Sequence, residues 1–87
     1  KDGNPVYTDC GFSIGPTGSF ADCPQAEILC VPGGHGVREA IADKAIVGFV
    51  RQQAASAQWV TSVCTGSFIL GAAGLLQGKR ATCHWAY

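Results

Sequence analysis

Two short apolar runs, each followed at once by small residues and then by a helical pattern, constrain the fold of this chain most strongly. The first run covers Glu27–Val31 and ends at Pro32-Gly33-Gly34, and the second covers Gln58–Val63 and ends at Cys64-Thr65-Gly66. A short, nearly continuous apolar run is typical of a strand in a parallel sheet, where helices cover both faces. We therefore expect two parallel strands here, with the first one buried on both faces.

Helical patterns separate and follow these strands. Val37–Ala42 predicts a short helix, and Asp43 is suited to cap a second helix over Lys44–Ala55. A third helix is predicted over Thr65–Ala73, with Gly74 ending it. The second helix has an apolar stripe formed by Ile46, Val47, Phe49 and Val50.

The flanking segments have weaker patterns. Pro5–Ile14 suggests extended chain or weak strands, Gly15–Gly18 a turn, and Phe20–Gln25 a turn or a short helical piece. Lys79–Cys83 is expected to begin a third strand. The resulting order of strand, helix, strand, helix, strand predicts an α/β fold with right-handed crossovers.

The helices are too few for the predicted sheet. A parallel sheet needs cover on both faces, and three helices in 87 residues do not provide it. We therefore expect residues 1–87 to be the central part of one larger domain, with strands missing on at least one side.

Composition excludes several classes of function. Six basic residues balance six acidic ones, so no net charge favours binding to nucleic acid or to an anionic membrane surface. No apolar run approaches the ~20 residues of a membrane span, and no apolar stretch of a signal peptide follows Lys1-Asp2-Gly3-Asn4-Pro5. These features predict a cytoplasmic protein that contacts neither a membrane nor, through this segment, nucleic acid.

The cysteines indicate a reduced protein without a metal. An odd number with irregular spacing argues against a disulfide framework, and Cys83-His84 lacks the paired spacing of a zinc site. We expect most of them to be small buried side chains. The five cysteines are Cys10, Cys23, Cys30, Cys64 and Cys83.

Cys64 is the candidate nucleophile. It follows a strand, precedes a helix and has small neighbours, as a residue on a sharp nucleophile-bearing turn requires. The following helix N-terminus favours the thiolate, and the Thr65 N–H would face an oxyanion formed on the substrate. A packed core thiol is the alternative for an arbitrary cysteine, but this position favours the nucleophile.

The glycine-rich loop after the first strand is expected to complete the site. Loops at the carboxyl ends of parallel strands open on the same edge of the sheet, so Gly33 and Gly34 can supply N–H groups to an oxyanion. His35 would line the pocket, and His84 would approach Cys64 from the third strand. The alternatives are an ordinary glycine-rich turn and two structural histidines.

Two stretches, Ile28–Gly36 and Ser62–Trp85, resemble the ThiJ/PfpI superfamily, which has the class I glutamine amidotransferase-like fold. Within it they are most similar to the isonitrile hydratase branch and to the sensor domains of AraC-type regulators. The resemblance implies a flavodoxin-like, doubly wound parallel sheet sandwich with a cysteine nucleophile elbow. It further implies a homodimer and no metal or organic cofactor.

The function implied by the resemblance is hydration of isonitriles to N-substituted formamides by a cysteine-dependent hydro-lyase. Cys64 and Thr65 would be catalytic, and Gly33, Gly34, His35, Thr65 and His84 would bind the substrate or its oxyanion. The family's acidic partner of the cysteine would precede Lys1. Threonine after the cysteine, where protease-like members have histidine, suits the isonitrile hydratase branch.

Three alternatives follow from the same resemblance. The segment can belong to the ligand-sensing domain of an AraC-type transcription regulator, or to another enzyme of the superfamily acting on glyoxals or glycated thiols. It can also be a redox sensor in which Cys64 is oxidised to a sulfinic acid.

Overall fold

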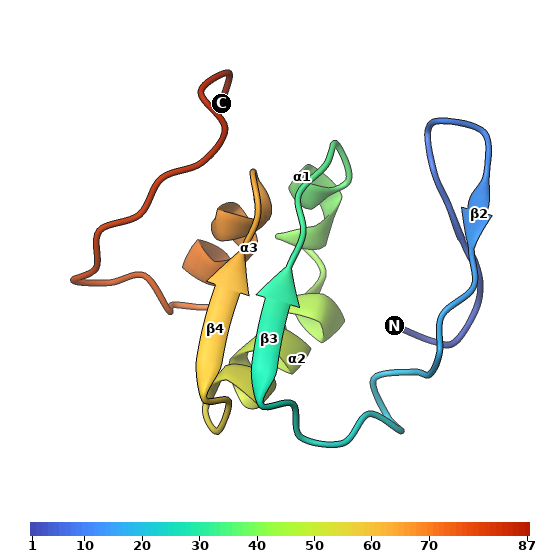
Figure 1. The fold of residues 1–87 in the computed structure, drawn as a ribbon, viewed down its shortest axis with the longest axis horizontal. Helices are drawn as coiled ribbons and strands as arrows, with labels where there is room; N and C mark the ends of the chain where they lie inside the picture. Colours follow the sequence, from blue (N-terminus) through green and yellow to red (C-terminus); the bar gives the residue numbers. More distant parts are fainter.

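The computed structural model of the chain describes residues 1–87 and has a two-stranded parallel sheet at its centre (Figure 1). β3 (Ile28–Val31) pairs with β4 (Trp59–Ser62) in a register that places Ile28 beside Trp59 and Val31 beside Ser62. Both predicted strands and their parallel pairing are confirmed. The helices between them form the crossover that a parallel pair needs.

Three helices accompany the sheet: α1 (Val37–Ala40), α2 (Lys44–Ala54) and α3 (Gly66–Ala72). The second and third agree with the sequence prediction to within one residue at each end. The first ends two residues earlier than predicted, because Asp43 adopts an extended conformation to begin α2. The chain between α1 and α2 is a tight turn in which the Asp43 N–H donates to the Ala40 carbonyl at 3.0 Å.

Asp43 caps α2 as predicted. Its side chain accepts hydrogen bonds from the backbone N–H groups of Ala45 and Ile46, two groups that have no partner within the helix. It also pairs with the Lys1 ammonium at 2.6 Å. The Lys1 contact, followed by the two backbone bonds, holds the pKa of Asp43 below its usual range.

Gly74 ends α3, also as predicted. Its φ of 79° lies in the left-handed region that glycine adopts without a steric penalty. The Arg51 Nε of α2 donates to the Ala73 carbonyl at 3.1 Å, which satisfies one of the orphan acceptors at this helix end. The last turn of α3 is thereby tied to α2.

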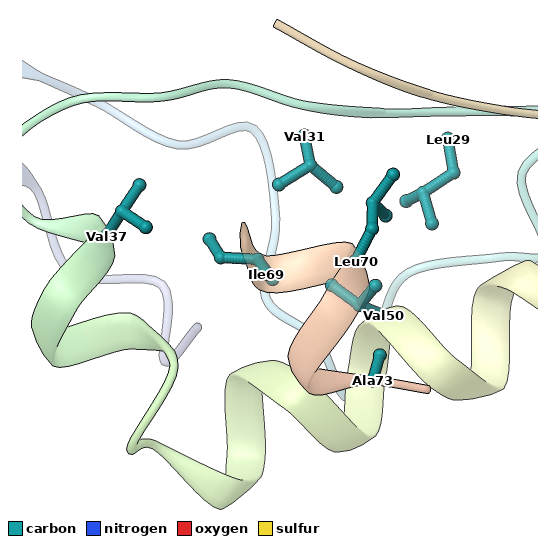
Figure 2. Packing of buried hydrophobic residues seen from close by; sticks show 7 residues of the cluster. All are labelled: Leu29, Val31, Val37, Val50, Ile69, Leu70 and Ala73. Atoms are coloured by element: carbon teal, nitrogen blue, oxygen red, sulfur yellow. The ribbon is translucent and has the colours of Figure 1, made fainter. Parts of the chain in front are cut away.

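All three helices lie on one face of the sheet, and the core forms between the two layers (Figures 1 and 2). Leu29 and Val31 point from β3 towards the helices, and Leu70 of α3 lies between them and Val50 of α2 (Figure 2). The buried hydrophobic cluster consists of Leu29, Val31, Val37, Val50, Ile69, Leu70 and Ala73.

The opposite face of the sheet is open. Ile28 is 63% exposed and its neighbour Trp59 is 61% exposed, while Leu29 is buried. The expectation that Glu27–Val31 is buried on both faces is therefore wrong for this segment. The physical reason is that successive strand residues point to opposite faces, and every helix here packs on the same one.

The N-terminal segment forms a small hairpin that stands beside the sheet (Figure 1). β1 (Val6–Tyr7) pairs antiparallel with β2 (Ser13–Ile14), which agrees with the weak strands expected there. The predicted turn after Phe20 is present, and the Phe20 ring stacks on Phe49 of α2 with centroids 3.9 Å apart. Phe49 therefore packs outside the main core.

The predicted third strand over Lys79–Cys83 is absent. The segment begins with a turn, in which the Lys79 N–H donates to the Leu76 carbonyl at 3.1 Å, and continues without regular structure. In Figure 1 the chain after α3 leads away from β4 rather than along it. A strand needs ladder hydrogen bonds to a neighbour, and this path provides none.

No helix combines the length and the apolar character needed to cross a membrane.

Candidate functional site at the carboxyl edge of the sheet

Cys64 occupies the tight turn between β4 and α3. Its φ is 55°, and it is the only non-glycine residue in the structure with a positive φ. The turn is held by two hydrogen bonds of 3.0 Å: the Val63 N–H donates to the Val31 carbonyl, and the Gly66 N–H donates to the Val63 carbonyl. A non-glycine residue in the left-handed region is energetically unfavourable and often marks a functional position. The Cys64 side chain is exposed.

Two glycines let the loops at this edge approach each other. A Cβ on Gly66 would collide with the carbonyl groups of Val31 and Pro32. A Cβ on Gly33 would lie 2.7 Å from the Thr65 nitrogen and 2.9 Å from the Cys64 Cβ. Any side chain at either position would separate the Cys64 turn from the loop that follows β3.

Thr65 ties the two loops together. It is only 4% exposed, and its Oγ1 accepts a hydrogen bond from the Gly34 N–H at 3.1 Å and donates to the Gly34 carbonyl at 3.4 Å. The Gly34 N–H, which we expected to serve an oxyanion, is thus engaged by Thr65. The backbone N–H groups of Thr65 and Gly33 have no acceptor within the chain.

The two histidines lie on the same small cavity as the cysteine. This cavity of 230 Å³ is lined by Gly34, His35, Cys64, Thr65, His84 and Tyr87. The His84 Nδ1 accepts a hydrogen bond from the Ala86 N–H at 3.1 Å, so the neutral ring carries its proton on Nε2.

A larger cavity adjoins the first one and contains a residue that the sequence analysis did not single out. Its volume is 390 Å³, and it shares Gly34, His35, Thr65 and Tyr87 with the cavity at Cys64. Arg38, in the first turn of α1, lines it. An arginine on a helix is ordinarily part of a solvated face. Only its place in the sequence, shortly after the glycine-rich loop, indicated that Arg38 could lie near the site.

The other cysteines do not join the site. Cys10, Cys23 and Cys30 are exposed and Cys83 is partly buried, so the expectation of mostly buried thiols is wrong. Cys30 is exposed because it lies on the open face of the sheet, and Cys10 and Cys23 belong to the N-terminal segment outside the core. No group of three or more His, Cys, Asp or Glu side chains lies close enough together to hold a metal ion.

Comparison with known families agrees with this architecture. The model of the DJ-1/PfpI family matches residues 1–87, which is the whole chain. The chain belongs to the DJ-1/PfpI family. The resemblance expected from the Ile28–Gly36 and Ser62–Trp85 stretches is thereby confirmed.

Two known proteins are similar to this segment in sequence. An isonitrile hydratase of Pseudomonas putida is 58% identical over 87 residues, which are all of this chain and 38% of that protein. A helix-turn-helix transcriptional regulator of Pseudomonas aeruginosa, GbdR, is 32% identical over 84 residues, covering 97% of this chain and 23% of the regulator.

A solved structure supports the fold assignment. The crystal structure of a ThiJ/PfpI family protein from Pseudomonas syringae superposes with a TM-score of 0.91 at 45% identity. The match covers 97% of this chain and 36% of that one. The chain therefore spans well under half the length of each of these three proteins.

Proposed function

We propose that the protein containing this segment is a cysteine-dependent hydro-lyase that hydrates isonitriles to N-substituted formamides. The observation that carries the proposal is the exposed Cys64 thiol on a left-handed turn, beside the unpaired Thr65 N–H and the glycine loop. The 58% identity to a protein named isonitrile hydratase supports the choice of substrate class. In this proposal the Cys64 turn is a nucleophile elbow within a doubly wound sheet.

The proposed reaction begins when the Cys64 thiolate attacks the terminal carbon of R–N≡C. Protonation of that carbon gives the thioimidate R–N=CH–S–Cys64. Water adds its oxygen to the same carbon and a proton goes to the nitrogen, which gives R–NH–CH(OH)–S–Cys64. The C–S bond then breaks to release R–NH–CHO and the Cys64 thiolate, and the hydroxyl proton returns to the acid that protonated the carbon. The acid that manages these protons lies outside residues 1–87.

Thr65 has two separable roles in this mechanism. Its backbone N–H is available to stabilise negative charge that develops beside Cys64. Its hydroxyl makes both of its hydrogen bonds to the Gly34 backbone, so we assign it to positioning the loop rather than to proton transfer.

The test uses the full-length protein and follows conversion of isonitrile to formamide by ultraviolet absorbance. Cys64→Ala should abolish turnover, because a covalent route has no substitute for its nucleophile. Cys64→Ser should lose nearly as much, since an alcohol is hardly ionised near neutral pH. The matched control is Cys10→Ala, which removes an exposed thiol in the N-terminal hairpin and should keep wild-type turnover.

Brief alkylation with iodoacetamide and peptide mapping provide a second readout. Cys64 should be labelled before the other four cysteines, because its turn exposes the sulfur at the start of a helix. Uniform labelling, or wild-type turnover in Cys64→Ala, would contradict the proposed role of Cys64.

A second candidate function is ligand sensing in a transcription regulator, favoured by the 32% identity to GbdR. The full-length protein would then bind a small ligand and DNA and show no turnover of isonitriles. The same assay, with a DNA-binding measurement added, separates the two functions.

A further inference from the structure

Arg38 is a cation without a partner on the wall of the 390 Å³ cavity. The structure contains one salt bridge, between Lys1 and Asp43, and Arg38 makes neither an ion pair nor a side-chain hydrogen bond. Its neighbour Glu39 does not compensate it, because adjacent residues on a helix do not face each other. Within residues 1–87 Arg38 is thus exposed and has no partner of opposite charge.

The surroundings of Arg38 favour an anionic ligand. No Asp or Glu side chain lines this cavity or the adjoining one at Cys64. His35 lines both cavities, and Val37 and Phe68 provide an apolar wall in the larger one. A volume of 390 Å³ lies within the range of small-molecule sites.

We propose that Arg38 determines substrate specificity by binding a carboxylate carried by the isonitrile. This inference rests on the function proposed above. The isonitrile carbon would lie at Cys64, the carbon skeleton beside Phe68, and the carboxylate at Arg38, so that one ligand spans the two joined cavities.

A carboxylate suits this site better than a phosphate. A planar guanidinium binds the two oxygens of a carboxylate with two parallel hydrogen bonds. A phosphate has further oxygens to satisfy, and the nearby Gly34 N–H is already bonded to Thr65. The single cation and the apolar wall match a small carboxylic acid.

The test compares two probes that differ in charge at one position, isocyanoacetate and its ethyl ester, as substrates of the full-length protein. Wild type should have a kcat/KM for the acid about 10-fold or more above that for the ester, because Arg38 would make charge-assisted hydrogen bonds to the carboxylate that the neutral ester cannot match. Arg38→Gln should reduce this ratio by about the same factor, and Arg38→Lys should retain part of it.

The matched control is Arg80→Gln, which removes the same charge from an exposed position outside both cavities and should leave the ratio unchanged. An unchanged ratio in Arg38→Gln, or an equal loss with both probes, would overturn the role of Arg38. If wild type converts neither probe, the proposed function fails. The role of Arg38 is then tested by calorimetry, with the same two probes binding to the Cys64→Ala variant. Tighter binding of the acid that is lost when Arg38→Gln is added supports the role of Arg38. Equal affinities for the acid and the ester reject it.

Discussion

Single residues at the carboxyl edge of the sheet form the candidate site of this segment. Cys64 holds a backbone conformation that costs a non-glycine residue roughly 1 kcal/mol or more, and the surrounding hydrogen bonds maintain it. Backbone strain of this kind often marks a functional position. Thr65 is buried next to it and bonded to Gly34, so the site depends on one hydroxyl for the relative position of its two loops.

Substitution of Thr65 tests this dependence. Thr65→Val keeps the shape and the backbone N–H but leaves the Gly34 N–H without its partner, so it should lower the free energy of unfolding of the full-length protein by about 1 kcal/mol and reduce kcat/KM. Thr65→Ser keeps the hydroxyl and should retain most of both, as measured by urea unfolding and steady-state kinetics. If Thr65→Val instead unfolds in urea as wild type does and loses much of its kcat alone, the hydroxyl takes part in proton transfer.

At the level of elements, the site depends on how closely α3 approaches the end of β3. Gly66 opens α3 directly against the Val31 and Pro32 carbonyl groups, and the Val63 N–H donates to Val31 beside them. The helix that begins after Cys64 is therefore positioned by backbone contact with β3. A side chain at this point would displace the helix and the cysteine turn together.

Replacement of two glycines by alanine separates this contact from general helix propensity. Gly66→Ala adds a methyl group that meets rigid backbone, so it should destabilise the full-length protein by about 2 kcal/mol or more. Gly48→Ala lies within α2, where an added Cβ meets nothing within 4 Å, and should stabilise by about 0.5–1 kcal/mol. Urea unfolding measures both. Similar effects of the two substitutions would show that the contact with β3 is unimportant.

At the scale of the whole molecule, the open face of the sheet is the dominant feature. Ile28 and Trp59 are exposed side by side on two paired strands. The similar isonitrile hydratase and the ThiJ/PfpI family protein of known structure are each more than twice as long as this chain. A parallel sheet is stable when both of its faces are covered. We propose that chain outside residues 1–87 covers this face in the full-length protein.

The isolated segment should consequently fold poorly. A polypeptide of residues 1–87 should show no cooperative thermal transition by circular dichroism, because its sheet has two strands and one bare face. The full-length protein, measured in the same buffer, is the control and should melt cooperatively. A cooperative transition in the segment would show that one covered face is sufficient.

The sequence by itself determined the local elements and the family. Short apolar runs, the Asp43 cap and Gly74 each depend on residues within a few positions, so β3, β4, α2 and α3 were predicted close to their observed bounds. The Cys64 turn was predicted for the same reason, since a strand, small residues and a helix follow one another there.

Only the tertiary structure decided what depends on distant parts of the chain. Which face of β3 is buried depends on where three helices pack, and Lys79–Cys83 is irregular because no strand lies alongside it. The bond between Thr65 and Gly34 joins positions 31 residues apart. Arg38 reaches the cavity beside Cys64 only because parallel strands bring their following loops to one edge of the sheet, a proximity that spacing along the sequence does not encode.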